Sequence, residues 1–331
     1  MHSDSSPSSS QHTNLEFVGF DPSAMTSALQ DGRIEHVQVE KGDFRGRAVH
    51  STSEQLRVDW GRYSLALLAR GDLSTERVSL AMLVGGSGPW RVLGAQARNG
   101  DLVVLPEGGE LVVTLPTKPQ WLVMQVARER LEMMGIDLLG LRSTNGWHMP
   151  VHDGDGGLQQ TLGEVGHVLR PADAADRTSL QVEDAVLTQA HEQLFAGMVS
   201  AWVATAAARG DRPEVLSSSE RWRVVRRAED YLAGRVDITV RMDELCDAAC
   251  TSLSRLERSF REVLGLSPRR YLTLRRLAAV RGELLAARPG TTVTDTATRW
   301  GFFHLGRFAE EYAALFFELP SQTLRAAAAR S

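Results

Sequence analysis

The sequence predicts an α+β protein in which a β-rich N-terminal part precedes an all-α C-terminal domain. From Arg33 to about Val126, short apolar stretches with partial alternation are interrupted every eight to twelve residues by Gly, Pro, Asn or Asp. This spacing is typical of an antiparallel sandwich or barrel. Beyond about Val182 the apolar residues recur at three- and four-residue intervals, which indicates amphipathic helices. A chain of 331 residues is long enough to bury the cores of two such domains.

The first thirteen residues, MHSDSSPSSSQHT, are rich in serine and lack the features of a secretory signal. We therefore interpret residues 1–13 as a disordered tail and expect the protein in the cytoplasm. The longest apolar runs fall far short of the ~20 residues that a membrane-spanning helix needs, which excludes a membrane protein. The two cysteines, Cys246 and Cys250, are too few for a disulfide scaffold. We expect both in the core or in a turn, because no second Cys pair or nearby histidine would complete a metal site.

Charge is unevenly spread along the chain. The formal net charge is −4, yet residues 217–331 contain 19 Arg and 14 Asp or Glu, a net of +5, so the upstream part carries −9. An excess of arginine at one end suggests an anionic partner for that end. The alternative is that the excess reflects only an Arg-rich codon usage, and the motifs must decide between the two.

The part of the chain before the basic end is predicted to consist of a β-rich domain, a helical segment and a linker. A β-rich domain over 14–180 is expected to include one short helix and a loop with the sequence STNGWHMPVHDGDGG. Residues 181–210 have a helical apolar pattern, and their apolar face either contacts a second subunit or packs on the β domain. Gly and Pro residues then stop the helix, and 211–219 is the predicted linker because its serines can cap a helix that begins near Glu220.

The last hundred residues contain an internal repeat. Cys250 matches Gly301 at an offset of 51, and after one inserted residue Phe260 matches Tyr312 at an offset of 52. Each copy has the pattern of a helix-turn-helix: a small residue where two helices cross, a tight turn, and a second helix held by apolar residues four apart. We place the all-α domain and its two units at 220–328, about 240–264 and about 292–316.

The second helix of each unit has a face without apolar anchors, which we expect to point outward. Ser252 is the predicted N-cap of this helix in the first unit, and His304, a weaker cap, takes that position in the second. The outward face is predicted to carry Leu253, Ser254, Arg255, Glu257, Arg258 and Arg261 in the first unit and Leu305, Gly306, Arg307, Ala309 and Glu310 in the second.

A single helix is predicted between the two units, from about Arg269 to Ala287. At 1.5 Å per residue its ~19 residues span roughly 28 Å. This length is close to the ~34 Å between successive major grooves on one face of B-DNA. Two recognition helices this far apart can read neighbouring segments of double-stranded DNA. The arginines available to its phosphates are Arg255, Arg269, Arg270, Arg275 and Arg276.

Residues from about Arg221 to Arg325 resemble the DNA-binding domain of the AraC/XylS family of bacterial transcriptional regulators. The resemblance covers roughly a third of the chain and rests on MDELCDAACTSLSRLERSFREVLGLSPRRYL and TVTDTATRWGFFHLGRFAEEYAALFFELPSQTLR. It implies that each unit presents one recognition helix to the major groove of DNA. These helices are placed at about Ser252 to Leu264 and about His304 to Phe316.

The resemblance also implies a set of side chains that face the bases. Arg258 can pair with guanine, and Glu257 can accept a hydrogen bond from the amino group of cytosine. Two positions depart from the family pattern. Phe317 replaces a usual glycine and is expected to alter the exit of the last recognition helix, and Cys250 replaces a turn glycine and is expected to strain or reshape the first turn. The base-facing candidates are Ser254, Glu257, Arg258, Leu305, Gly306 and Arg307.

For the N-terminal part, the resemblance implies a cupin-like β-barrel with flanking helices that binds a small-molecule effector and pairs two subunits in a homodimer. The residues of the effector pocket cannot be chosen from the sequence. Activation is the commoner mode of the family, so we expect an activator, with RNA polymerase as a further partner. The main alternative keeps DNA binding but gives the N-terminal domain only a role in dimerisation.

A metal-dependent enzyme of the cupin type is the remaining alternative. The candidate ligands are scattered, and the pair His148 and His152 lies in a segment whose Pro and Gly residues indicate a loop. The sequence also lacks the G-x-S-x-G and P-loop patterns and a suitably placed G-x-G-x-x-G. We therefore predict no catalytic residues, no cofactor and no metal site. The scattered candidate ligands also include His36, His50 and His167.

Overall fold

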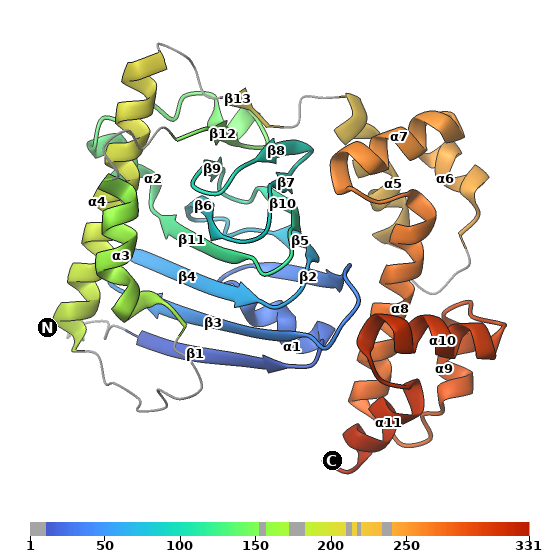
Figure 1. The fold of residues 1–331 in the computed structure, drawn as a ribbon. Coiled ribbons are helices and arrows are strands. Elements are labelled where there is room, and N and C mark those ends of the chain that lie inside the picture. Colours follow the sequence, from blue (N-terminus) through green and yellow to red (C-terminus); the bar gives the residue numbers. More distant parts are fainter. Residues whose placement is uncertain are drawn as a thin grey trace, which may run out of the picture.

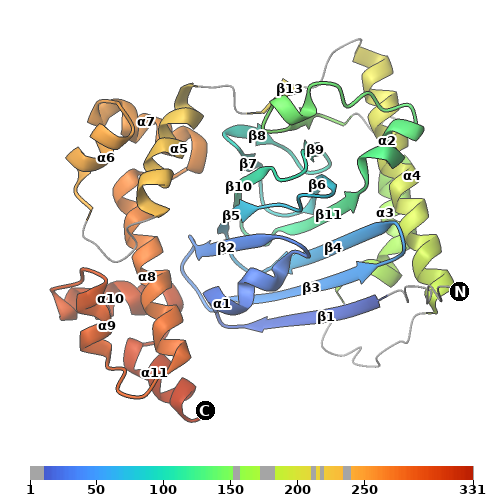
Figure 2. The ribbon, with the colours of Figure 1, turned by 180° about the vertical axis from the view of Figure 1, so that it is seen from behind.

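The structure is a computed structural model that describes residues 11–151, 157–171, 183–209, 214–216, 220–233 and 240–330. Two antiparallel sheets form the N-terminal part, and a domain made only of helices follows (Figure 1). Seen from behind, the helical domain lies along one side of the sheets and two long helices lie along the opposite side (Figure 2). The predicted fold class, a cupin-like β-rich domain with flanking helices and an all-α domain of two helix-turn-helix units, is confirmed.

The larger sheet has the strand order β1-β3-β4-β11-β6-β9-β12-β13. Every neighbouring pair in it is antiparallel. Its strands are β1 (Gln11–Val18), β3 (Arg45–Thr52), β4 (Leu56–Tyr63), β6 (Val78–Gly85), β9 (Leu102–Leu105), β11 (Gln120–Val126), β12 (Trp147–Met149) and β13 (Glu214–Val215).

The smaller sheet has the order β2-β5-β10-β7-β8 and faces the larger one. Buried side chains of both sheets fill the space between them, among them Ile34, Leu83 and Val113. The alternation of buried and exposed residues that the sequence shows is therefore that of a two-layer β structure. Its strands are β2 (Arg33–Gln38), β5 (Leu67–Asp72), β7 (Trp90–Val92), β8 (Ala95–Ala97) and β10 (Glu110–Leu115).

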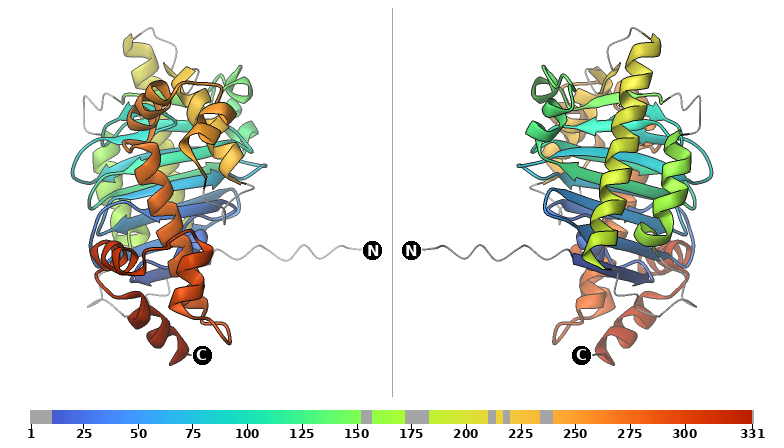
Figure 3. Two further views of the ribbon diagram at one scale, coloured as in Figure 1. Left: turned by 90° about the vertical axis from the view of Figure 1, so that its right-hand side faces the viewer. Right: turned by 90° about the vertical axis from the view of Figure 1, so that its left-hand side faces the viewer.

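Two helices cover the outer face of the larger sheet, α3 (Gly157–Leu169) and α4 (Asp184–Arg209), as Figure 3 shows. The apolar side of α4, which includes Leu194 and Met198, is buried in a second core against strand residues such as Leu122. The sequence left two interpretations for the apolar face of this segment, a subunit contact or packing on the β domain. The structure shows that the apolar face packs on the β domain. The short helices α1 (Pro22–Met25) and α2 (Arg128–Met133) lie in connections.

The helical domain comprises seven helices among the described residues. The first unit is α6 and α7, the second is α9 and α10, and the long helix α8 joins them (Figure 1). Their bounds are α5 (Glu220–Ala233), α6 (Met242–Ala248), α7 (Leu253–Leu264), α8 (Pro268–Ala286), α9 (Val293–Arg299), α10 (Leu305–Phe316) and α11 (Pro320–Ala328).

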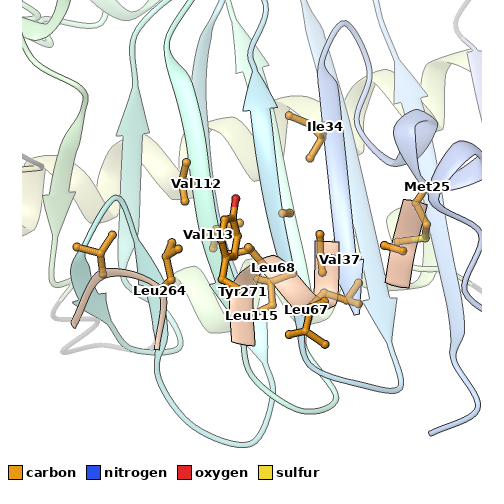
Figure 4. Packing of buried hydrophobic residues seen from close by; sticks show 14 of the residues in the cluster. Met25, Ile34, Val37, Leu67, Leu68, Val112, Val113, Leu115, Leu264 and Tyr271 are labelled. Atoms are coloured by element: carbon orange, nitrogen blue, oxygen red, sulfur yellow. The ribbon is translucent and has the colours of Figure 1, made fainter. Parts of the chain in front are cut away.

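The helical domain packs on the outer face of the smaller sheet, and one continuous core joins the two. Figure 4 shows Leu264 at the end of α7 and Tyr271 of α8 beside side chains of β5 and β10, among them Leu68 and Val112. The hydroxyl of Tyr271 donates a hydrogen bond of 2.6 Å to the buried carboxylate of Glu229, and Arg70 of β5 lies 3.3 Å from that carboxylate. Apolar packing and a buried ion pair thus fix the helices on the sheet.

Two sequence predictions need correction. Residues 11–13, assigned to the disordered tail, belong to the edge strand β1, because the whole strand pairs with β3 from Gln11 opposite Thr52 onward. The loop assigned around His148 contains β12, which pairs with β9 and β13 and buries Trp147 against Trp202. Both strands are held by partners distant in sequence, so local Ser, Pro and Gly signals mislead there. His152, most of the predicted linker and residues 1–10 lie outside the described residues.

Candidate nucleic-acid interface

The two helix-turn-helix units have the same backbone hydrogen bonds in their turns. In the first unit the N–H of Cys250 donates to the carbonyl of Asp247 (3.0 Å), and the N–H of Thr251 donates to the carbonyl of Cys246 (2.9 Å). In the second unit the corresponding donors, Gly301 and Phe302, reach Thr298 (3.0 Å) and Ala297 (2.9 Å). The repeat in the sequence therefore corresponds to a repeat in three dimensions.

Both units also end their second helix in the same way. Gly265 follows α7 with a φ of 74°, and its N–H donates to Arg261 (3.1 Å). Phe317 follows α10 with a φ of 58°, and its N–H donates to Ala313 (2.9 Å). The expected change in the exit of the last helix is therefore wrong. Phe317 adopts the conformation that glycine takes in the first unit, at the steric cost that a Cβ brings there.

Cys250 has a φ of 51°, in the left-handed region that Gly301 occupies in the second unit at 79°. The first turn is thus strained, as predicted, but it keeps the shape of the second turn. The N-cap prediction for Ser252 is confirmed, because its side chain accepts a hydrogen bond from the N–H of Arg255 (3.4 Å). His304 makes no such bond, so α10 begins without a side-chain cap.

Apolar anchors hold each recognition helix against its own unit. Leu256 and Phe260 of α7 are fully buried, and so is Tyr312 of α10, with Phe308 almost completely so. The hydroxyl of Tyr312 accepts a hydrogen bond from Arg281 of α8 (3.2 Å) and bonds to Thr323 of α11 (2.9 Å). Each helix therefore has a fixed inner face, and only its opposite face is open to a partner.

The base-facing candidates of the first unit lie on this open face. Ser254 and Arg258 are exposed, and Glu257 is half-buried. The guanidinium of Arg258 has no ion-pair partner among the residues that the structure describes, so it is free to bind. Glu257 instead lies 3.3 Å from Arg261 one turn later in the helix.

The candidates of the second unit, Leu305, Gly306 and Arg307, are all exposed. Arg307 donates to Glu311 at 2.9 Å, and a Cβ added at Gly306 would meet no atom within 4 Å, so a partner can approach the backbone there closely. Sequence reasoning missed Phe303, which is 68% exposed in the turn before α10. An aromatic residue in the turn before the recognition helix, where it has no core to enter, is the signal that could have marked Phe303 as a contact residue.

The phosphate candidates divide into two groups. Arg269 and Arg270 lie in the first turn of α8, where Arg269 is exposed, and Arg255 is exposed beside Glu220, with which it forms an ion pair. Arg275 is turned toward the smaller sheet, with its side chain 13% exposed and its guanidinium 3.9 Å from Glu35. This position argues against a phosphate role for Arg275.

Arg276, which was also expected to contact phosphate, is likewise engaged within the protein. Its guanidinium lies 5.6 Å from the centre of the Phe302 ring, and burial lowers its pKa. A cation stacked on an aromatic ring in this way stabilises the second turn. The side chain is thus part of the second unit and is not free on its surface.

A small cavity of about 60 Å³ lies between the two sheets of the N-terminal domain. Its walls are apolar apart from four side chains, His36, Tyr63, Trp90 and Trp121, and the indole N–H of Trp90 already donates to the carbonyl of Arg98 (3.2 Å). Burial lowers the pKa of His36 to about 4, so this side chain is neutral at pH 7. The indole N–H of Trp121 makes only a weak hydrogen bond of poor geometry to the hydroxyl of Tyr63, and neither group has another hydrogen-bond partner within the described part of the chain.

The described residues also bear on the alternative of a metal-dependent enzyme. They contain no group of three or more His, Cys, Asp or Glu side chains placed to hold a metal ion. The Nε2–H of His148 donates a hydrogen bond of 3.0 Å to the carboxylate of Asp101. No helix in this part of the chain is both long enough and apolar enough to cross a bilayer.

In the comparison with known proteins, the matching family model and the relatives cover the C-terminal helical domain. A family model described as a helix-turn-helix domain matches residues 245–326. The "Probable thc operon regulatory protein" of Rhodococcus erythropolis is 38% identical over 103 residues, which are 31% of this chain and 31% of that protein. The "XylDLEGF operon transcriptional activator 3" of Pseudomonas putida is 38% identical over 104 residues, 31% of this chain and 30% of that protein. The match thus spans less than a third of either relative.

Two solved structures are also similar to this chain. The crystal structure of a probable AraC family transcriptional regulator from Rhodopseudomonas palustris is 31% identical and covers 31% of this chain and 96% of that chain, with a TM-score of 0.30. The AraC-like transcriptional activator CuxR is 13% identical and covers 87% of this chain and 100% of that chain, with a TM-score of 0.38.

Two helix-turn-helix units on one connecting helix define the class of protein: a helix-turn-helix protein with two recognition helices. Through this C-terminal domain, the chain belongs to the AraC/XylS family of transcriptional regulators.

Proposed function

We propose that this protein is a sequence-specific DNA-binding regulator of transcription and that it acts as an activator in the cytoplasm, with RNA polymerase as a further partner. The observation that carries the proposal is the duplicated unit. Two helix-turn-helix turns with the same hydrogen bonds are fixed on α8, and each leaves one face of its recognition helix exposed. A relative whose name describes an operon transcriptional activator supports the choice of activation.

In this proposal the exposed faces of α7 and α10 read bases in the major groove. Arg258 is the strongest candidate for guanine, because its side chain is exposed and has no competing carboxylate among the described residues. Leu305, 39% exposed at the start of α10, suits the methyl group of thymine. Phosphate contacts come from Arg255, Arg269 and Arg270, which fix the register on the duplex without reading it. The remaining base-facing candidates are Ser254, Glu257, Gly306 and Arg307.

The test of DNA binding uses the full-length protein and sheared genomic DNA at a stated salt concentration. Sequencing of the bound fragments should return a shared motif with two half-elements about one helical turn apart. Recovery of fragments without any shared motif, with and without candidate effectors, would contradict sequence-specific binding.

We further propose that a small-molecule effector binds between the two sheets. The walls of the cavity include no Arg, Lys, Asp or Glu, and His36 is neutral, so a charged ligand would be buried without a counter-ion. The effector is therefore a neutral, mostly apolar molecule with one acceptor for the hydroxyl proton of Tyr63, which has no acceptor among the described residues. A cavity that binds benzene has a volume of about 150 Å³. The effector is thus very small, or the sheets move apart slightly as it binds.

Tryptophan fluorescence of the full-length protein tests the effector site, because Trp90 and Trp121 line the cavity. Titration with neutral small molecules should give a saturable change, and the corresponding carboxylates should give none. Ala81→Leu, which adds bulk inside the cavity, should abolish the response. Ala326→Leu adds the same bulk at an exposed position of α11 and should leave it unchanged.

The alternative is that the N-terminal domain only holds two subunits together. Absence of saturable binding for both ligand classes, combined with a dimeric mass by light scattering, would favour this alternative. In either case we propose a homodimer. The side of α4 that faces away from the sheet is the candidate contact, since it carries exposed Val186 and Val203.

A further inference from the structure

A polar pocket of about 170 Å³ lies beside the start of the first recognition helix, between α5 and the turn that precedes α7. The sequence repeat does not predict it, because α5 lies outside both helix-turn-helix units. Three of the side chains in its wall are arginines from two different helices. The polar or titratable side chains that line it are Glu220, Arg223, Arg227, Cys250, Thr251 and Arg255.

The pocket has an excess of positive charge. Arg223 and Arg227 lie one turn apart on the same side of α5, and both are exposed. Neither has a carboxylate within ion-pairing distance among the described residues. Arg255 is paired with Glu220, the one acidic side chain in the wall. Like charges four residues apart in a helix repel each other, so an anion between Arg223 and Arg227 would relieve that repulsion.

Hydrogen-bond donors complete the site. The hydroxyl of Thr251 is buried and has no hydrogen-bond partner in the part of the chain that the structure describes. The first turn of α7, which begins at Leu253, presents backbone N–H groups that no helix carbonyl can accept. Cationic side chains, an unpaired hydroxyl and a helix N-terminus are together the donor set that binds phosphate.

The second unit has an aromatic ring at the position where the first unit has the hydroxyl of Thr251. By the offset that relates the two turns, Phe302 occupies the position of Thr251. The ring of Phe302 lies under the guanidinium of Arg276, at 5.6 Å, and this aromatic contact replaces a polar site. The hydroxyl of Thr251 therefore distinguishes the first unit from the second.

We infer that this pocket binds a phosphate group of the DNA backbone at the edge of the groove that α7 enters. The inference rests on the proposed DNA-binding function and adds Arg223 and Arg227 to its contacts. A recognition helix enters the major groove with its N-terminal residues, and phosphates line both edges of that groove. The pocket lies at this N-terminal end, one turn before Arg258.

Salt dependence of DNA affinity tests the inference, because each phosphate contact adds about 0.9 to the slope of log affinity against log salt. We would measure the binding of full-length protein to a random-sequence duplex for the wild type, the double variant Arg223→Gln/Arg227→Gln, and Arg221→Gln. Arg221 lies on the same helix outside the pocket and pairs with Glu262. The double variant should lose about one unit of slope, and Arg221→Gln should lose much less.

Equal slopes for the double variant and Arg221→Gln would overturn the phosphate pocket while leaving DNA binding intact. Failure of the wild type to bind any duplex would instead overturn the proposed function. Circular dichroism of each variant should match the wild type, because all three arginines are exposed.

Alkylation of Cys250 provides a second measurement that needs no variant. Cys250 is exposed in the wall of the pocket, and fragment-ion mass spectrometry separates it from the half-buried Cys246. The duplex should slow alkylation of Cys250, and pyrophosphate at the same ionic strength should slow it much less. Protection by pyrophosphate but not by the duplex would assign the pocket to a free phosphate compound and overturn the inference, as would protection by neither.

Discussion

The hydroxyl of Thr114, in β10, donates a hydrogen bond of 3.0 Å to the carbonyl oxygen of Leu264, the last residue of the first recognition helix. The amide of Gln38, in β2, donates a similar bond of 2.8 Å to the carbonyl of Leu315, near the end of the second. The smaller sheet therefore binds the C-terminal turn of both recognition helices. A movement of this sheet, for example when a molecule binds in the cavity between the two sheets, would therefore alter the position of both units.

Replacement of Thr114 by valine tests this contact, because valine keeps the shape but cannot donate a hydrogen bond. We expect a loss of about 1 kcal/mol of unfolding free energy, the usual net value of one hydrogen bond. Urea denaturation measures it, with Thr75→Val as the control at an exposed position. Equal midpoints for Thr114→Val and the wild type would show that the hydrogen bond contributes nothing.

The left-handed residue at the end of α10 should be a site of stabilisation. Phe317 is 67% exposed, so its replacement by glycine loses little apolar burial, and it removes a Cβ from a backbone conformation that costs about 1–2 kcal/mol. We expect Phe317→Gly to raise the thermal midpoint. Ala309→Gly, inside α10, should lower it by the helix propensity difference of about 1 kcal/mol. A lower midpoint for both variants would contradict the strain at Phe317.

The stability of the protein should fall in mild acid because of His191. This side chain of α4 is buried against the larger sheet, its Nε2 lies 2.7 Å from the hydroxyl of Ser51 in β3, and burial together with nearby His12 lowers its pKa to about 4. Since the unfolded chain takes up the proton first, at a pKa near 6.5, stability is complete above that pH and decreases toward pH 4.

The loss attributable to His191 is on the order of 2–3 kcal/mol across this range. Urea midpoints between pH 7 and pH 4 should therefore fall less steeply for His191→Gln than for the wild type. His167→Gln, at an exposed position on α3, should retain the full slope. Parallel curves for His191→Gln and the wild type would show that His191 does not titrate as described.

Two buried tyrosines should respond differently to the loss of the hydroxyl. The hydroxyl of Tyr63 in the cavity accepts only a weak hydrogen bond from Trp121, and its own proton has no acceptor among the described residues, so Tyr63→Phe should be neutral or stabilising. Tyr312 bonds to Arg281 and Thr323, so Tyr312→Phe should cost about 1–3 kcal/mol. Thermal denaturation compares them. A marked loss for Tyr63→Phe would indicate a partner for that hydroxyl, such as a bound water.

The sequence predicts the helix-turn-helix units well, because their signals are local. The anchors Leu256 and Phe260 lie four residues apart, and the turn positions Cys250 and Gly301 follow from the repeat. Edge strand β1 is not predicted, because its polar residues are mostly exposed and backbone pairing with β3 alone defines it.

The surface on which the helical domain packs cannot be predicted from the sequence either. In the sequence, Arg275 is one of several similar arginines of α8, and only the fold brings it near Glu35. Conversely, Arg223 and Arg227 precede both repeats, so no pattern marks them as partners of Arg255. Contacts between elements distant in sequence decide which arginines of this basic domain are free.

Sequencing of DNA bound by the wild type, Arg258→Ala and Arg307→Ala tests the central claim most directly. Each arginine is expected to read one base in a different half-element, at a cost of about 1–3 kcal/mol when removed. The wild type should select a motif with two half-elements about one helical turn apart, and each variant should lose preference in one of them only. An identical motif for all three proteins, or equal losses on specific and random DNA, would contradict the two-helix readout.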